Sequence, residues 1–204
     1  MADSELAAAL TRLDEITRLL RRECPWDREQ DERSIVPHTV EEAYELADAA
    51  HSGDDAKLVD ELGDVLFQVY FLSLLLEERG AGSLAEVAEH CRQKLIRRHP
   101  HVFGEREAET AGDVVRNWNQ IKRDDERGGE VFGEIAVTLP STLYAKKVLK
   151  RAQGAGRAAP VPGGDQGALL LEAVRNAVEA GVDPELELRR AADRYREQIE
   201  RGDP

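Results

Sequence analysis

The chain has 204 residues, of which 41% are hydrophobic, 34% charged and only 5% aromatic, and its formal net charge is −13. The abundance of Ala, Leu, Glu and Arg favours helices over sheets. The acidic balance argues against a general nucleic-acid coat, which needs a basic face, and suits a cytoplasmic protein that binds cations. We expect no membrane contact, because no run approaches the roughly 18–20 apolar residues of a spanning helix. The two cysteines, Cys24 and Cys91, indicate no disulfide framework.

Apolar periodicity and capping signals predict an all-α protein, since no segment alternates as a strand does. The predicted helices cover residues 3–22, 39–52, 55–79, 83–98, 110–127, 141–152, 168–180 and 184–200. The segment 65–76, VLFQVYFLSLLL, is expected to be buried on most sides. Residues 153–167 are rich in Gly, Pro and Ala and predict a flexible linker or surface loop.

The start of the second predicted helix rests on two residues. Thr39 and Glu42 have the spacing of a capping box, so the helix is expected to begin at Thr39. The preceding stretch CPWDREQDERSIVP (24–37) is too polar and too broken by proline to be one continuous helix. Gly53 is expected to end the helix as a C-cap.

Four carboxylates are arranged symmetrically about Gly53. Glu45 and Glu61 each lie eight residues from this glycine, and Glu42 and Asp64 each lie eleven residues from it. If the two helices fold back as an antiparallel hairpin, the four carboxylates come level in one patch. Such a patch raises the pKa of its members unless a cation neutralises it, and hard oxygen ligands suit Mg²⁺ or Mn²⁺. The alternative is a surface of ordinary solvated acids in an acid-rich chain.

Five short motifs together resemble the MazG family of nucleoside triphosphate pyrophosphohydrolases. They are CPWDREQ (24–30), EEAYE (41–45), ELGDVLFQV (61–69), KLIRRHPHVF (94–103) and NWNQIK (117–122). The resemblance implies an all-α NTP pyrophosphatase fold and Mg²⁺-dependent hydrolysis of an NTP or dNTP to the monophosphate and pyrophosphate. It also implies that the EExxE and ExxD residues are catalytic and that four of them hold the metal. The metal ligands would be Glu42, Glu45, Glu61 and Asp64, and Glu41 would orient water or act as a base.

The resemblance further implies positively charged and aromatic contacts with the nucleotide. Lys94 and Arg98 are implied phosphate contacts, with Arg97 as a further partner, and Trp118 is implied to stack on the base. Lys122 would reach a phosphate, and Lys57 is a weaker candidate. Two alternatives remain open: a basic helix end is common in its own right, because cations there favour the helix dipole, and Trp118 would fit a core.

The C-terminal part resembles the latter half of a second MazG copy that has lost its site. In this alignment Asp165 and Ala168 replace the acids of ELGD, Gln198 replaces Arg98, and no second EExxE precedes them. The alternative is that amphipathic helices resemble each other by composition. The predicted domains are 1–127, the MazG-like domain; 128–167, a connector; and 168–204, an inactive helical remnant.

The resemblance points to an enzyme that acts broadly on nucleoside triphosphates in nucleotide-pool cleaning or stress signalling. A narrower dUTP or dCTP pyrophosphatase and a phosphoribosyl-ATP pyrophosphatase are alternatives within the superfamily. A non-catalytic, regulatory nucleotide-binding module is an alternative from another class. We expect a homodimer, because two or three helices around a site leave apolar faces uncovered, and no nucleic-acid partner.

Overall fold

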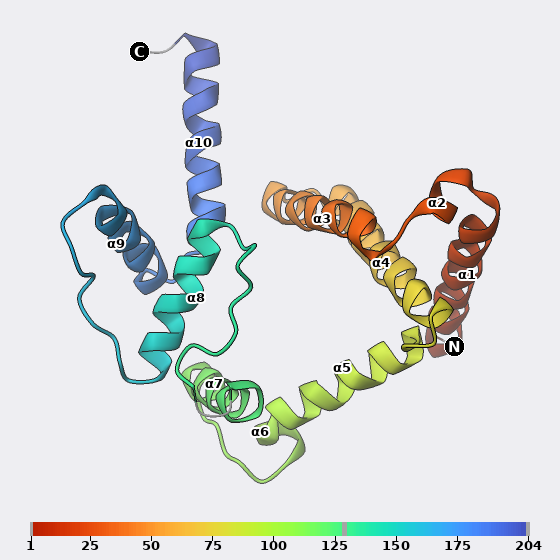
Figure 1. Cartoon of the computed structure of the whole chain (residues 1–204), viewed down its shortest axis with the longest axis horizontal. Coiled ribbons are helices and arrows are strands. Elements are labelled where there is room, and N and C mark those ends of the chain that lie inside the picture. The colour runs from red at the N-terminus through yellow and green to blue at the C-terminus, as the bar shows by residue number, and fades with distance from the viewer. Residues whose placement is uncertain (1, 128–129, 203–204) are drawn as a thin grey trace. The chain divides into compact units, whose positions relative to one another are not determined.

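The computed structural model describes the backbone of residues 2–127 and 130–202 and the side chains of residues 4–124 and 130–202 (Figure 1). In these ranges the regular structure is helical and no strand occurs, which confirms the all-α prediction. The helices are α1 (Ala2–Glu23), α2 (Pro25–Glu29), α3 (Glu32–Ser52), α4 (Asp55–Glu78), α5 (Leu84–Arg98), α6 (Pro100–Phe103), α7 (Ala111–Arg127), α8 (Ser141–Gly154), α9 (Gln166–Glu179) and α10 (Pro184–Arg201). No helix in the described part of the chain is long and apolar enough to cross a membrane.

The chain divides into two compact units, Met1–Lys94 and Leu95–Pro204. The first unit contains α1 to α4 and most of α5, and the second contains α6 to α10. The domain boundaries expected from the sequence, at residues 127 and 167, remain a prediction.

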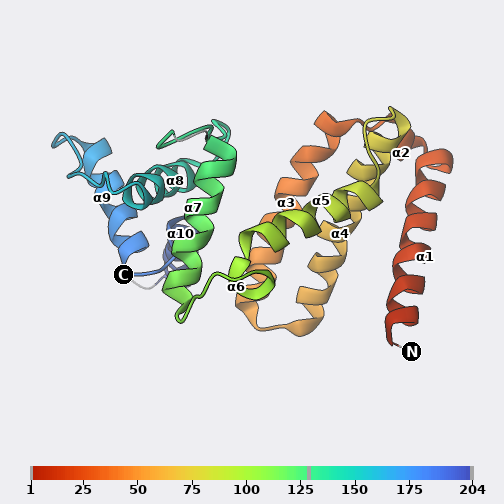
Figure 2. The same cartoon turned by 90° about the horizontal axis from the view of Figure 1, so that it is seen from below.

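An antiparallel hairpin of α3 and α4 dominates the first unit, as Figure 2 shows. Gly53 closes α3 in the left-handed conformation, with φ 72°, which favours a residue without a Cβ atom. Asp54 then caps α4 by accepting hydrogen bonds from the backbone amides of Ala56 and Lys57. The turn predicted at Gly53 is therefore confirmed, and both helices keep their full length up to it.

The predicted start of α3 at Thr39 is wrong, because the helix begins at Glu32. Asp31 forms a capping box with Ser34, and the Asp31 carboxylate accepts from the backbone amides of Arg33 and Ser34. Pro37 lies inside the helix and removes one intrahelical hydrogen bond.

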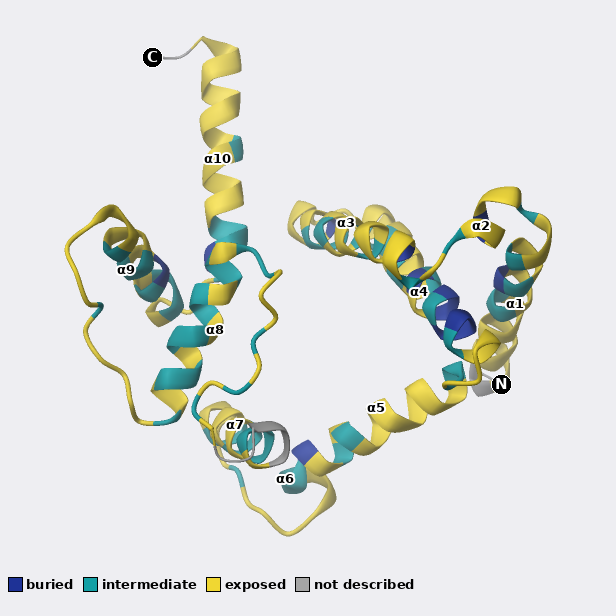
Figure 3. Ribbon diagram, in the orientation of Figure 1, coloured by how far each residue is buried: buried dark blue, intermediate teal, exposed yellow. Residues whose placement is uncertain are grey.

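The core of the hairpin is small and lies on one side of α4. Ile35, Phe71 and Leu75 form its buried cluster, and Phe67 and Leu72 pack against it. Most side chains of residues 65–76 are buried or half-buried, as expected, and the buried ones lie in the second half of α4 (Figure 3). One stripe of α4 is exposed within one chain. Its exposed apolar side chains are Val59, Leu62, Leu66 and Val69.

Arginine pairs tie α1 and α2 to the end of α4. Arg18 forms two hydrogen bonds with Glu77, and Arg21 forms two with Glu78, at 2.7–2.9 Å. Arg21 also donates to the backbone carbonyls of Asp27 and Gln30, which lie in and directly after α2. The N-terminal helices are thereby held against the hairpin by planar, charge-assisted contacts.

In the second unit, α8, α9 and α10 pack together and α7 contacts α8. Lys146 and Thr142 of α8 contact Asp183 and Glu185 at the start of α10. The segment between α8 and α9 is non-helical, as predicted for the linker, although α8 extends to Gly154 and α9 begins at Gln166. The short helix α6 follows the predicted stop at His99 and was not expected from the sequence.

Candidate functional site

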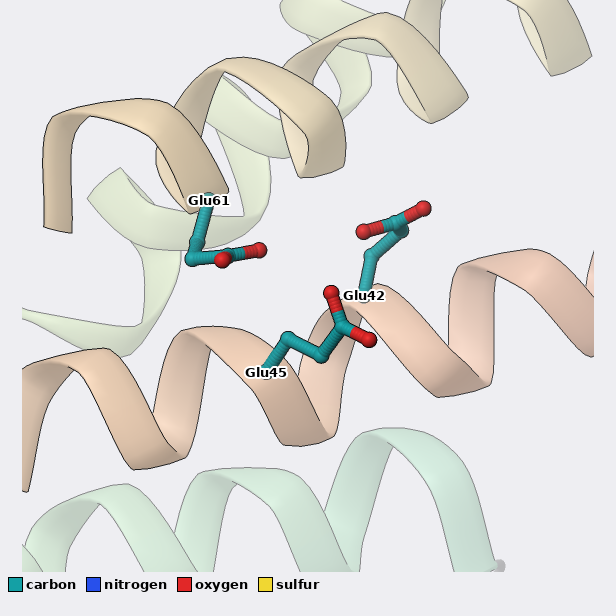
Figure 4. A group of neighbouring side chains, drawn as sticks. All are labelled: Glu42, Glu45 and Glu61. Carbon is teal, nitrogen blue, oxygen red and sulfur yellow. The ribbon is translucent and has the colours of Figure 1, made fainter. Parts of the chain in front are cut away.

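Three carboxylates converge between the helices of the hairpin. Glu42 and Glu45 on α3 and Glu61 on α4 each offer an oxygen atom, and these three atoms lie within 4.8 Å of one another. Figure 4 shows the side chains reaching toward one another from the two helices. The pairing predicted from equal distances to Gly53 thus brings acids from both helices into one group.

The register that produces this group follows from local features of the two helices. Glu42 and Glu45 are three residues apart, so they share one face of α3. The left-handed turn at Gly53 reverses the chain without intervening residues that would shift the register. Further along the hairpin, Thr39 donates to the side-chain oxygen of the buried Gln68 at 3.3 Å. This polar contact fixes α3 against α4 one turn from Glu42.

Asp64 lies outside the group of three but acts on it electrostatically. It is exposed and has one methylene fewer than a glutamate, so its carboxylate reaches less far. Its charge is nevertheless one of the causes that raise the pKa of both Glu42 and Glu61. The structure therefore brings three of the four predicted ligands together and places the fourth beside them.

Two carboxylates of this group, Glu42 and Glu61, are held in an environment that disfavours their charged form. Loss of solvation, followed by the charges of Asp64, Glu45, Glu61 and Glu41, raises the pKa of Glu42. Loss of solvation, followed by Glu45, Asp64 and Asp60, raises the pKa of Glu61. One oxygen of Glu61, Oε2, is buried and has no hydrogen-bond partner in the described part of the chain. A buried carboxylate oxygen facing other carboxylates fits a divalent cation with oxygen ligands.

The other acid of the motif, Glu41, is not part of this group. Its side chain is exposed, and Oε2 lies 3.8 Å from Nδ1 of His38 one turn earlier on α3. Lys57 is also exposed and lies in the first turn of α4. Neither side chain belongs to the converging group, so their roles remain predictions.

The predicted phosphate contacts lie along the end of α5 and on α7. Lys94 is half-buried, and Arg97 is exposed in the last turn of α5. Lys122 on α7 is half-buried. The structure shows where Lys94, Arg97 and Lys122 lie, but their contacts with a phosphate remain predictions.

Arg98 and Trp118, two further predicted nucleotide contacts, pack against each other. Arg98 is only 5% exposed, and its guanidinium lies over the indole ring of Trp118 at 5.1 Å from the ring centre. The edge of the His99 ring meets Trp118 at 5.0 Å between ring centres, and His101 lies 5.6 Å from His99. Sequence reasoning used the His-Pro-His stretch as a helix stop and as part of the motif KLIRRHPHVF, and it did not predict this aromatic cluster. The signal available was the presence of two histidines in the motif that carries Arg98.

Comparison with known proteins covers the segment that carries this group of acids. A model of the MazG nucleotide pyrophosphohydrolase domain matches residues 30–103, which contain the whole acidic hairpin. An uncharacterized 26.1 kDa protein in the blaB 3' region of Streptomyces cacaoi is 39% identical over 198 residues, covering 94% of this chain and 81% of that protein.

Two named relatives are similar over a shorter range. A nucleoside triphosphate pyrophosphohydrolase of Escherichia coli K12 is 38% identical over 136 residues, covering 65% of this chain and 52% of the relative. A nucleoside triphosphate pyrophosphohydrolase/pyrophosphatase MazG of Thermotoga maritima is 37% identical over 135 residues, covering 65% and 51%. This chain spans about half the length of these two relatives. The domain match and the long alignment together show that the chain belongs to the MazG family and carries its nucleotide pyrophosphohydrolase domain, a hydrolase domain.

Proposed function

We propose that the chain hydrolyses nucleoside triphosphates to the monophosphate and pyrophosphate in a Mg²⁺-dependent reaction. The observation that carries this proposal is the convergence of Glu42, Glu45 and Glu61, with Glu61 Oε2 buried and unpartnered among the described residues. A triphosphate is a polyanion, so an acidic site binds it only when cations bridge carboxylate and phosphate oxygens. The names of the two relatives support the same reaction class.

Glu42, Glu45 and Glu61 would hold the metal, with Asp64 as a fourth ligand beside them. When bound, Mg²⁺, or Mn²⁺ in its place, would polarise the phosphorus under attack and lower the pKa of the attacking water. The hairpin presents these carboxylates from two helices that pack along their length, which would limit the rearrangement needed to bind an ion. Glu41 directly precedes Glu42 on α3 and is exposed to solvent. We assign to Glu41 the orientation or the deprotonation of the attacking water.

The proposed phosphate and base contacts rest on the resemblance of the motifs that carry them, and Trp118 and Lys122 lie outside the matched residues 30–103. Lys94, Arg97, Arg98 and Lys122 would neutralise phosphate oxygens, and Lys57 is the weakest candidate among the cations. The buried Arg98 holds one face of Trp118, so stacking on a base would use the remaining ring surface. The contact between Arg98 and Trp118 is also compatible with a structural role, in which the two side chains pack the last turn of α5 against α7.

A homodimer formed through α4 is part of the proposal. Val59, Leu62, Leu66 and Val69 recur in steps of three and four and are 37–71% exposed. This stripe lies on the helix that carries Glu61 and Asp64. An apolar stripe of this length on a two-helix hairpin indicates a partner helix face, and a second hairpin would complete a bundle.

The C-terminal helices support the interpretation of residues 168–204 as an inactive remnant after the connector 128–167. Asp165, the counterpart of Glu61, caps α9 by accepting from the backbone amide of Ala168 at 2.8 Å. Its carboxylate stabilises a helix end, and Ala168 replaces the second acid. One hydrolytic site in residues 1–127 then serves the whole chain.

We assign the activity to nucleotide-pool cleaning or a stress response in the cytoplasm, without a nucleic-acid or membrane partner. The test is pyrophosphate release from the eight common NTPs and dNTPs, measured with Mg²⁺, with Mn²⁺ and with a chelator. Turnover of several nucleotides that requires the metal supports the proposal. Turnover of a single nucleotide would indicate a narrower enzyme, and no turnover of any nucleotide by the metal-loaded protein would overturn the assignment in favour of a binding module.

A further inference from the structure

A small cleft in the second unit is lined by cationic and amide groups from two helices. Asn119 and Arg123 of α7 and Lys150, Arg151 and Gly154 of α8 surround a cavity of about 50 Å³. No acidic side chain of the described residues is part of this lining. Three converging cations are unusual in a chain whose formal net charge is −13.

The cations of this cleft have no carboxylate partner among the described residues. Arg123 donates to the side-chain oxygen of Gln120 at 2.8 Å, and Arg151 donates to the backbone carbonyls of Phe132 and Glu134. No hydrogen bond or ion pair within the described part of the chain involves Lys150. Lys146, one turn earlier on the same helix, is instead paired with an aspartate of α10. Lys146 is therefore paired with an acid, whereas the cations of the cleft have none among the residues that the structure describes.

Stabilisation of a helix end explains only part of this arrangement. Lys150 and Arg151 lie in the last turns of α8, where cations favour the helix dipole. Arg123 and Asn119 come from the second half of a different helix, and α8 does not require them as caps. Their convergence on the same cavity indicates a ligand that is negative and accepts hydrogen bonds.

The size of the cavity limits the ligand to a compact group. One water occupies roughly 10–15 Å³ of such a volume, so about 50 Å³ accommodates roughly three to five water-sized groups. Drug-sized ligands need pockets of roughly 300–1,000 Å³, so a whole nucleotide does not fit inside. Guanidinium, ammonium and amide donors suit phosphate oxygens, and three cations match a polyanion better than a monovalent anion.

We propose that the cleft between α7 and α8 is an anion site, distinct from the carboxylates of the α3–α4 hairpin, which holds one phosphate of a diphosphate group while the other phosphate lies at the mouth of the cleft. The diphosphate is either free pyrophosphate or the terminal part of a nucleoside triphosphate. Free pyrophosphate would be the product of the proposed hydrolysis bound at a second site, and this part of the inference rests on the proposed function. Binding itself requires neither turnover nor metal.

The test is calorimetric titration of the full chain with inorganic pyrophosphate in the presence of a chelator, so that no metal links the anion to the carboxylates. The double variant Arg123→Gln/Lys150→Gln removes two of the cations. The double variant Lys147→Gln/Arg157→Gln is a matched control, because it removes the same charge from two exposed positions outside the lining. Circular dichroism on both variants checks that helix content and thermal midpoint are retained.

We expect one pyrophosphate per chain and at least about a tenfold loss of affinity in Arg123→Gln/Lys150→Gln, because removing a charge-assisted hydrogen bond to an anion lowers affinity about tenfold or more. The control should stay within about twofold of wild type. Equal losses in both variants would show diffuse electrostatics and overturn the proposal, as would the absence of pyrophosphate binding. A comparable loss in Lys94→Gln would place the anion at the expected substrate site and also overturn it.

A second titration separates the two sources of the diphosphate. A non-hydrolysable triphosphate, α,β-methylene-ATP, is titrated into the same variants under the same conditions. A loss restricted to Arg123→Gln/Lys150→Gln shows that the cleft takes the terminal phosphates of a nucleotide. If only pyrophosphate depends on these residues, the ligand is the free anion. Nucleotide hydrolysis is measured separately. If pyrophosphate does not bind at the α7–α8 cleft, the proposed hydrolysis is unaffected, and if hydrolysis is not observed, anion binding at the cleft can still be tested.

Discussion

The α3–α4 hairpin and the α9–α10 region use the same kind of residue for opposite purposes. In the hairpin, Glu42 and Glu61 face other carboxylates, and loss of solvation followed by the charges of neighbouring acids raises the pKa of each. At the start of α10, burial alone would raise the pKa of Asp183, but hydrogen bonds from Lys146 and from backbone amides lower it overall. Asp183 caps its helix. An acid therefore contributes to stability or to a candidate metal site according to what it faces.

The largest expected contrast is in catalysis. Glu61→Gln removes the charge of a proposed metal ligand at constant size, and we expect turnover to fall about a thousandfold, since metal stabilisation of the transition state amounts to several kcal/mol. Asp165→Asn is the matched change in the remnant and should leave turnover within about twofold, because asparagine is an equally good N-cap. Steady-state pyrophosphate release measures both, with circular dichroism as the control for folding. Retained activity in Glu61→Gln would refute its assignment as a ligand.

The second contrast is in core stability. Phe71 is fully buried in the hairpin cluster, so Phe71→Ala should lower the free energy of unfolding by about 3–5 kcal/mol. Val174 is the buried side chain of α9, and Val174→Ala removes two methyl groups, for a loss of about 2 kcal/mol. Urea denaturation followed by circular dichroism measures both. Equal losses would mean that the C-terminal helices are packed as firmly as the hairpin.

The third contrast locates the proposed dimer interface. Val59→Lys/Leu66→Lys places two charges in the exposed stripe of α4, and the mass in solution should fall from dimer to monomer. Tyr195→Lys/Ile199→Lys places the same charges on the exposed side of α10 and should leave the dimer intact. Sedimentation equilibrium distinguishes the two. If the α10 variant alone dissociates, the interface lies in the C-terminal region instead.

The smallest contrast concerns pH and metal. Because the pKa values of Glu42 and Glu61 are raised in the folded chain, the folded state binds protons more tightly than the unfolded state above their ordinary value of 4.5. Without metal, stability from these groups should therefore rise as the pH falls from 7 toward 5. Added Mg²⁺ at pH 7 should raise the thermal midpoint, because a bound cation would also neutralise the charges of these carboxylates.

The comparison of wild type with Glu61→Gln isolates this effect from other titrating groups. The variant should show a higher midpoint than wild type at pH 7 without metal, and a smaller gain on adding Mg²⁺. Asp183 behaves in the opposite direction, because its lowered pKa provides stability above its ordinary value of 3.8 that is lost as the pH falls through the folded value. A midpoint in wild type that is insensitive to both Mg²⁺ and pH between 5 and 7 would contradict the metal assignment.

Sequence reasoning predicted the helices well where local signals agree. The turn at Gly53 follows from short-range chemistry and is confirmed. The helix expected to start at residue 83 is capped by Ser83, whose hydroxyl oxygen accepts from the backbone amide of Glu86. The start of α3 was missed because two capping signals compete, at Asp31 and at Thr39. Thr39 instead donates to the backbone carbonyl of Ile35 and to Gln68 on α4. Only the packing of α4 against this segment decides between the two.

The candidate site shows the same division. The spacing of Glu42, Glu45 and Glu61 about Gly53 was sufficient to predict their convergence, because a short turn between two regular helices leaves little freedom of register. The sequence did not predict that Asp64 stays outside the group, since this depends on side-chain length and on the distance between the helices. The packing of Arg98 on Trp118 was equally unpredictable, because it joins residues from two helices.

The sequence by itself determined the helical class, the positions of most helices, the family and the acids that belong together. These properties depend on periodicity, caps and motif order, which are local or nearly so. Tertiary structure alone decided which acids lose their solvation, which face of α4 stays exposed and which cations of α7 and α8 share a cleft without a carboxylate partner among the described residues. The physical reason is that solvation and charge at a site depend on all neighbours in space, and most of these neighbours are distant along the chain.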